Sequence, residues 1–139
     1  MSLMMGFCLT VLTLVLQCAG IVALIEWLRR LAPRNLRDLR VFRSAILVLQ
    51  TTVALLVLHG LIISLWASCY HWLCVPSWDS SLYFSACTYA TVGYADVVLS
   101  PQWRMLGPLE SVIGILMCGL SVSFLFTLVN RLIPASETQ

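Results

Sequence analysis

The residues with the most chemical content stand in one short run, Thr91-Val92-Gly93-Tyr94-Ala95-Asp96. Rings of backbone carbonyl oxygens from symmetry-related chains can replace the hydration shell of a cation when each strand is extended and its side chains point away. Gly93 permits a backbone conformation that a Cβ atom would obstruct, and Tyr94 can pack outward to hold the width of the ring. The backbone of this run therefore has the chemistry that a cation site of carbonyl rings would need, and its candidate residues are Thr91, Val92, Gly93, Tyr94 and Ala95.

Other chemistries find little support in the sequence. No nucleophile stands beside a base, no phosphate-binding loop occurs, and neither His59 nor His71 has partner ligands at zinc-binding intervals. Among the six cysteines, Cys69 and Cys74 are close enough to raise the question of a disulfide, which the sequence leaves open. We expect no enzyme activity and no cofactor beyond a permeant ion.

The composition indicates a membrane protein, because 60% of the 139 residues are hydrophobic and 10% are charged, against roughly a quarter charged in soluble domains. Three stretches lack charged residues, 2–25, 44–69 and 111–129, with His59 inside the second. Each approaches or exceeds the roughly 20 residues that a helix needs to cross a bilayer. The first lacks the basic start of a signal peptide, so we expect it to be retained. The predicted fold is an all-α integral membrane protein with three transmembrane helices.

The arginines predict the orientation of these helices. Arg104 precedes the third stretch and Arg131 follows it, and the other six lie between the first two: Arg29, Arg30, Arg34, Arg37, Arg40 and Arg43. Positive charge favours the cytoplasmic side. We expect the 29–43 loop and the C-terminus in the cytoplasm, with the N-terminus and residues 69–104 outside a cell membrane. Four aromatic residues would lie in the outer headgroup belt: Tyr70, Trp72, Trp78 and Trp103. The net charge of +2 is then explained by the arginines that orient the helices, and it gives no reason to expect binding to nucleic acid.

The segment between the second and third stretches is too apolar for a solvated loop. A half-length helix is predicted over 80–90, with Asp79 or Ser80 as its N-cap. Such a helix must turn back, and irregular backbone at membrane depth needs protein or a watery cavity around it. Its C-terminal partial charge would favour a cation. A re-entrant pore loop fits this pattern, and an interfacial helix with a polar turn is the alternative.

The run from Thr88 to Asp96, Thr88-Tyr89-Ala90-Thr91-Val92-Gly93-Tyr94-Ala95-Asp96, resembles the T-x-T-T-V-G-Y-G-D signature of tetrameric potassium channels with a pore loop. The similarity covers residues 45–131 and is greatest to small prokaryotic members. It implies K⁺ ligands at the carbonyls of Thr91, Val92, Gly93 and Tyr94, with Asp96 at the outer mouth and a homotetramer around the pore. It also implies pore-helix support from Tyr83, Phe84, Cys87 and Thr88.

Two alanines depart from the signature. Ala90 replaces a threonine, and Ala95 replaces a glycine. If position 95 requires a left-handed backbone, alanine costs about 1–2 kcal/mol per chain. The sequence therefore leaves three outcomes open: a potassium-selective channel, a weakly selective cation channel, or a non-conducting subunit that assembles with other pore subunits and modulates them.

Several residues have two readings. Gly114 and Gly119 resemble the gating-hinge glycines of the inner helix, yet glycines also allow close helix packing. Glu110 follows Pro108 near a helix start, where we favour a helix-capping role for its carboxylate over a role in permeation.

Arginine at every third position over 34–43 resembles a voltage sensor. A cytoplasmic amphipathic linker, with Arg34, Arg37, Arg40 and Arg43 on anionic headgroups, fits better because Glu26 is the only acid in the preceding span.

The expected organisation follows from these patterns. An N-terminal transmembrane helix at 1–28 and an Arg-rich linker at 29–43 precede a pore domain at 44–133, and a short cytoplasmic tail occupies 134–139. The pore domain divides into an outer helix (44–68), the pore helix (80–90), the filter (91–95) and an inner helix (105–131).

Overall fold

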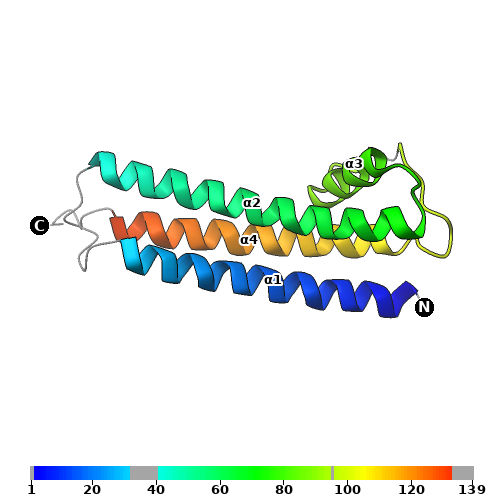
Figure 1. Cartoon of the computed structure of the whole chain (residues 1–139), viewed down its shortest axis with the longest axis horizontal. Coiled ribbons are helices and arrows are strands. Elements are labelled where there is room, and N and C mark those ends of the chain that lie inside the picture. Colours follow the sequence, from blue (N-terminus) through cyan, green and yellow to red (C-terminus); the bar gives the residue numbers. More distant parts are fainter. Residues whose placement is uncertain (1, 32–40, 95, 133–139) are drawn as a thin grey trace, which may run out of the picture.

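The computed structural model describes residues 2–31, 41–94 and 96–132. In this part the chain forms α1 (Ser2–Leu31), α2 (Val41–Leu73), α3 (Trp78–Tyr89) and α4 (Leu106–Leu132). The three long helices run side by side, and α3 lies at the end of the bundle where the N-terminus also lies (Figure 1). The predictions for Arg34, Arg37, Arg40, Ala95 and the 134–139 tail fall outside the described residues.

Each long helix contains a stretch that can cross a membrane, with 27 residues in α1, 32 in α2 and 27 in α4. All three exceed the roughly 20 residues that a span requires. The predicted all-helical membrane fold, with a short helix between the last two spans, is confirmed. α1 and α2 extend a few residues past the predicted limits of 28 and 44–68, whereas α4 differs from the predicted 105–131 by one residue at each end. Pro76 follows α2 closely, and a residue before proline is disfavoured in helical conformation.

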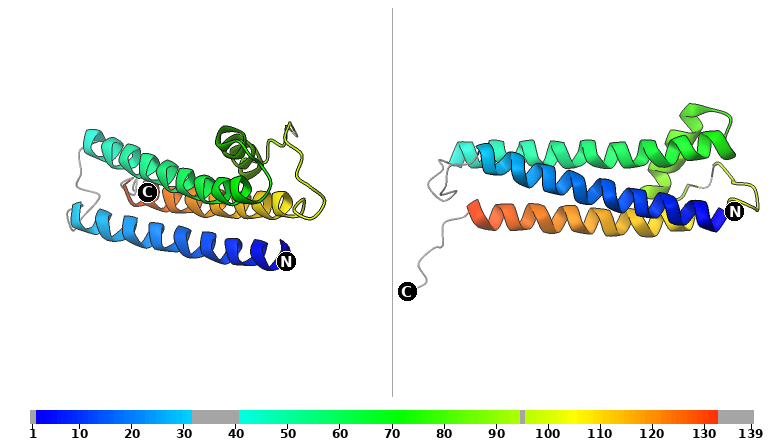
Figure 2. Two further views of the ribbon diagram at one scale, coloured as in Figure 1. Left: turned by 45° about the vertical axis from the view of Figure 1, so that its right-hand side comes forward. Right: turned by 60° about the horizontal axis from the view of Figure 1, so that its bottom comes forward.

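α1 packs against both α2 and α4, and α2 packs against α4, so the long helices form a three-helix bundle (Figure 2). Two contacts fix α1 on α2. The indole Nε1–H of Trp66 donates to Thr13 Oγ1 at 3.0 Å, and both side chains are fully buried. A Cβ atom at Gly20 would lie 2.6 Å from Leu58 Cδ2, so the absence of a side chain lets the two helices approach closely there.

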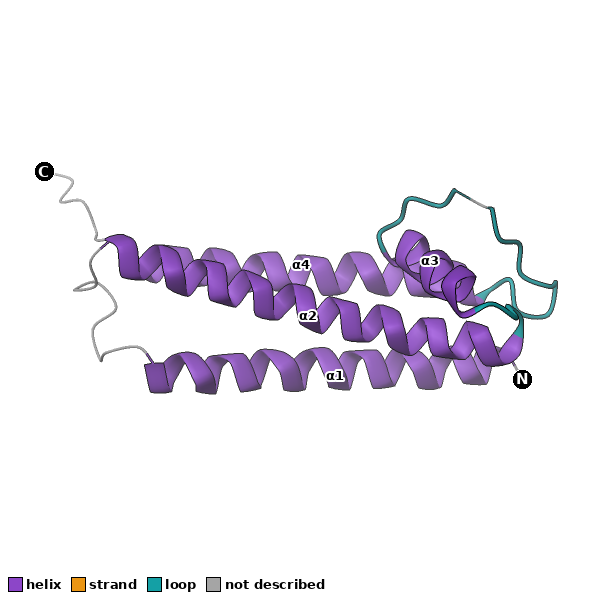
Figure 3. Cartoon of the chain, turned by 45° about the horizontal axis from the view of Figure 1, so that its top comes forward, coloured by secondary structure: helices purple, strands orange, loops and turns teal. Residues whose placement is uncertain are grey.

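A tight turn carries the chain from α2 into α3. The amide groups of Cys74 and Val75 both donate to the carbonyl of Tyr70 at 2.9 Å, which ends α2. Ser77 then has an extended backbone and is the N-cap of α3, so the predicted caps Asp79 and Ser80 were wrong. The reason is that the carbonyl of Ser77 already accepts the first helical bond, from the amide of Ser81 at 3.0 Å. Figure 3 shows α3 against α2 and the long loop that leads on to α4.

The hydrophobic core lies at the α3 end of the bundle. Two of the four aromatic residues predicted to lie in the outer headgroup belt belong to this core. Tyr70 and Trp103 are buried in this core, together with Trp66 and Leu106. Their rings are covered by protein, so they do not face lipid as belt residues would. Trp72 and Trp78 are exposed, as a belt position requires. The core therefore fixes α2, α3 and the start of α4 relative to one another. The filter run, residues 91–96, begins just after the end of α3 in this region.

Candidate pore-loop site

The filter run begins in a hydrogen-bonded helix cap. The amide of Thr91 donates to the carbonyl of Thr88 at 3.0 Å, and the amide of Val92 donates to the carbonyl of Cys87 at 2.8 Å. This pair of bonds is the Schellman pattern, with Ala90 as the C-cap and Thr91 in the left-handed position after it. The cap turns the chain out of α3 and ties the first filter residues to the pore helix.

Two residues of the run have positive φ angles, 60° at Thr91 and 62° at Gly93. Glycine adopts this region without strain, as the sequence suggested for Gly93. Thr91 is different, because a β-branched residue at positive φ is a strong outlier and costs energy that the surroundings must offset. The Schellman cap supplies that compensation through the two amide bonds, so the strain is held at the base of the filter.

The carbonyl oxygens of the run are available to a ligand. Within the described chain, none of the carbonyls from Thr91 to Tyr94 accepts a hydrogen bond. All four residues are exposed, with Val92 at 51% and Tyr94 at 67% of their full surface. Oxygens without intrachain partners on an uncovered strand can be offered to an ion or to neighbouring chains.

The four predicted support residues each contact a neighbouring part of the loop or core. The hydroxyl of Tyr83 donates to Asp96 Oδ2 at 3.1 Å, which joins the pore helix to the end of the run. The hydrogen bond to Asp96 is the main cause that raises the pKa of Tyr83 to about 12, so the donor stays protonated at neutral pH. Phe84 packs edge-on against the Tyr70 ring, with centroids 4.9 Å apart. The backbone carbonyls of Cys87 and Thr88 form the helix cap already described.

Sequence reasoning missed a buried polar cluster behind the pore helix. Glu110 is fully buried and accepts hydrogen bonds from the Tyr70 hydroxyl at 2.7 Å and the Ser85 hydroxyl at 2.5 Å. The cluster joins α2, α3 and α4 through side chains. The predicted capping role of Glu110 was wrong, because this residue lies beyond the first turn of α4 and faces the protein interior. An ionisable residue within a span was the available signal.

The two inner-helix glycines occupy different environments. A Cβ atom at Gly114 would overlap the carbonyl oxygen of Tyr89 and lie 3.0 Å from its carbonyl carbon. A Cβ atom at Gly119 would meet nothing within 4 Å. Gly114 is therefore a close-approach site between α4 and the end of α3, whereas Gly119 has no such contact in one chain. Ser111, one turn before Gly114, donates to the Thr88 carbonyl at 2.9 Å.

The titratable groups elsewhere in the described part of the chain form no second chemical centre. All six cysteines are free thiols, and burial raises the pKa of Cys74. No group of three His, Cys, Asp or Glu residues among the described positions could hold a metal ion. His59 faces α3 and α4, where its ring nitrogens lie near the hydroxyls of Tyr89 and Ser121, so its face points toward other helices as the sequence predicted.

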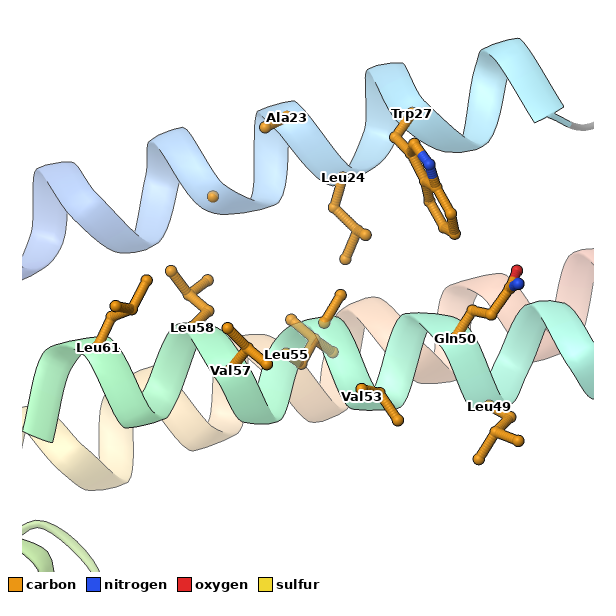
Figure 4. A pocket seen from close by; sticks show the side chains of 12 residues that line it. Ala23, Leu24, Trp27, Leu49, Gln50, Val53, Leu55, Val57, Leu58 and Leu61 are labelled. Atoms are coloured by element: carbon orange, nitrogen blue, oxygen red, sulfur yellow. The ribbon is translucent and has the colours of Figure 1, made fainter.

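The described structure contains an apolar hollow between two spans and a smaller hollow beside the filter run. The larger, about 670 Å³, lies between α1 and α2 and is lined by apolar side chains such as Leu24 and Leu58, with Trp27 and Gln50 toward one end (Figure 4). No charged side chain of the described residues lines it. The smaller, about 370 Å³, lies between the pore helix, the filter run and the start of α4. Tyr94, Asp96 and Arg104 line it, so it belongs to the candidate pore loop.

The fold and the loop define a class of protein: a multi-pass membrane protein in which a short helix and a carbonyl-lined turn lie between two spans. The family described as ion channel matches residues 45–131, which cover most of α2, all of α3, the filter run and nearly all of α4. The chain therefore belongs to this ion channel family and is not an enzyme. Searches of curated proteins and of solved structures gave no significant match.

Proposed function

We propose that the chain is a subunit of a potassium-selective channel in which four copies surround a central pore. The observation that carries this proposal is that the exposed residues from Thr91 to Tyr94 have carbonyls that accept no hydrogen bond within the described residues. One chain supplies one strand, and coordination of K⁺ by rings of carbonyls uses four such strands. A fourfold assembly would also cover the apolar surface that the filter and α4 leave exposed, for example at Val92 and Leu116.

The orientation and surroundings of the channel follow from charge. With the arginine-rich segment inside, the N-terminus and the pore loop face outward and Asp96 stands at the outer mouth. Arg34, Arg37, Arg40 and Arg43 then contact anionic headgroups of the inner leaflet of a cell membrane. A pore loop between two spans, α2 and α4, fits the small prokaryotic members of the potassium channel group.

Two other functions stay open because of Ala95. Alanine in place of the second filter glycine can strain the outer ion site, which would give a weakly selective cation channel. A more severe disturbance would give a non-conducting subunit that assembles with other pore subunits and modulates them. Both alternatives keep the pore-loop architecture. The weakly selective channel differs from the proposal in which ions pass, and the modulating subunit differs in conduction and in its partner subunits.

The deciding experiment is K⁺ and Na⁺ flux through the purified full-length protein in liposomes, beside the variant Ala95→Gly. The proposal predicts K⁺ flux well above Na⁺ flux in both proteins. Equal K⁺ and Na⁺ flux in the wild type with selectivity restored by glycine would identify the weakly selective channel. A silent wild type with a conducting Ala95→Gly variant would identify the modulating subunit. The mass of the detergent-solubilised assembly tests the four copies separately.

A further inference from the structure

A line of polar side chains crosses the bundle from α1 to the end of the pore helix. Gln17 Nε2 donates to Ser121 Oγ at 3.0 Å, which joins α1 to α4. Ser121 Oγ lies 3.0 Å from His59 Nε2 on α2, and His59 Nδ1 lies 2.8 Å from the Tyr89 hydroxyl. Tyr89 is the last residue of α3. Every described helix thus contributes one member to this polar line, which we define as Gln17, Ser121, His59 and Tyr89.

The polar line is enclosed by apolar helices. Gln17 is fully buried, Tyr89 and Ser121 are 3% and 5% exposed, and His59 is half-buried. Hydrogen bonds in such surroundings are costly to leave unmade, because no water replaces a lost partner. Either neutral tautomer of His59 completes the line, since one ring nitrogen donates and the other accepts. The position of each member is therefore specified by its neighbours.

Gln17 is not explained by simple packing. Its Nε2 group also donates to the carbonyl of Met117 at 3.5 Å, whereas its Oε1 atom is buried without a partner within the described chain. A leucine at this position would avoid the cost of that unpaired oxygen. The amide is thus a poor choice for stability alone, and what it adds is a directional link between α1 and α4.

The far end of the polar line meets the filter. Tyr89 directly precedes Ala90 and Thr91, the residues that turn the chain into the filter run. Its hydroxyl is held by His59, and its backbone is pressed against Gly114 of α4. A shift of α1 or α4 at the level of Gln17 and Ser121 therefore moves the group that anchors Tyr89. The strained φ of Thr91 makes this segment sensitive to such a shift.

We propose that α1 is a regulatory helix that sets the conformation of the filter through the polar line, with Gln17 and His59 as positioning residues. This inference rests on the proposed function, since it assigns a control element to the same filter. It also gives the first span a role beyond lipid-facing packing.

The test compares two variants that each remove the hydrogen bonding of one buried α1 side chain. Gln17→Leu breaks the polar line, whereas Thr13→Val removes a buried bond to Trp66 that is not part of the polar line. K⁺ flux per assembly and the K⁺-to-Na⁺ ratio are measured for both in liposomes. We expect Gln17→Leu to change the K⁺ flux or the K⁺-to-Na⁺ ratio by about 2- to 10-fold, which corresponds to the net free energy of a typical hydrogen bond. Thr13→Val should leave both unchanged.

Conservative variants and a double-mutant cycle distinguish a positioning role of these residues from a general loss of stability. Ser121→Ala should reproduce the effect of Gln17→Leu, and Ser121→Thr, which keeps the hydroxyl, should restore wild-type flux. Gln17→Leu combined with Tyr89→Phe should show less than the sum of the two single effects, because both break the same line. Equal effects of Gln17→Leu and Thr13→Val, or strictly additive effects in the cycle, would overturn the proposal.

A second readout does not depend on conduction. The side-chain ¹⁵N resonances of His59 in the full-length protein report the partners of both ring nitrogens. They should shift in Tyr89→Phe and in Gln17→Leu and stay fixed in Thr13→Val. If the wild type carries no flux but these shifts occur, the proposed function fails and the coupling stands; unchanged resonances in Gln17→Leu would contradict the coupling itself.

Discussion

Gly114 of α4 lies so close to the end of the pore helix that a Cβ atom there would overlap the carbonyl oxygen of Tyr89. The two residues are 25 positions apart in the chain and meet where α3 turns into the filter run. A backbone-to-backbone contact of this kind cannot be relieved by moving a flexible side chain. Gly114 thus fixes the distance between the inner helix and the base of the filter.

The first prediction follows from this contact. Gly114→Ala forces α3 and α4 apart, at a cost of about 1–3 kcal/mol for overpacking. We expect a lower thermal unfolding midpoint of the detergent-solubilised protein, together with reduced K⁺ flux. Gly119→Ala is the matched control, since its Cβ would meet nothing within 4 Å in one chain. Equal destabilisation by the two substitutions would contradict the role assigned to Gly114.

The second prediction concerns the buried carboxyl group of Glu110. Glu110→Leu leaves the Tyr70 hydroxyl buried without an acceptor, at a cost of about 1–3 kcal/mol. Glu110→Gln keeps the shape and one acceptor oxygen, so it should be closer to wild type. Thermal unfolding measured by circular dichroism checks the expected order of unfolding midpoints, with the wild type highest, Glu110→Gln next and Glu110→Leu lowest. A Leu variant as stable as the wild type would show that the cluster does not stabilise the packing of α2, α3 and α4.

The third prediction concerns the link between the pore helix and the end of the filter run. Tyr83→Phe removes the hydrogen bond to Asp96 and keeps the ring, so we expect a several-fold loss of K⁺ preference over Na⁺ in liposome flux. Because the pKa of Tyr83 is raised to about 12, the hydroxyl remains a donor throughout the neutral range, and the bond is lost only when pH rises through that value. The difference between wild type and variant should therefore not depend on pH near neutrality. Unchanged selectivity in the variant would show that this bond does not hold the filter.

The fourth prediction tests orientation. Val98 is 86% exposed in the loop between α3 and α4, and Arg131 lies at the opposite end of the bundle. In a variant whose six cysteines are replaced by serine, Val98→Cys should react with a membrane-impermeant maleimide on intact cells. Arg131→Cys should react only after the cells are opened. The reverse pattern would place the pore loop in the cytoplasm and contradict the arginine-based orientation.

Part of this protein could be predicted from local sequence alone. Three apolar stretches gave the spans, because the free energy of inserting a helix into a bilayer is a sum over consecutive residues. The filter run was found in the same way, since the carbonyls that could bind an ion belong to adjacent residues from Thr91 to Tyr94. The half-length helix before it followed from its length and from turn residues near Ser77.

The tertiary structure decided which side chains meet. Nothing local to Glu110 indicates that its partners are Tyr70 and Ser85, and nothing local to Gln17 points to Ser121. Local sequence was likewise insufficient at two other places. It predicted Asp79 or Ser80 as the N-cap of the pore helix, and it predicted that Tyr70, which is buried, lies in the headgroup belt. Hydropathy depends only on what a helix contains, whereas a hydrogen bond between helices depends on how each is rotated about its axis. That rotation is set by contacts such as Gly20 with Leu58 and Gly114 with Tyr89, which join residues far apart in the chain.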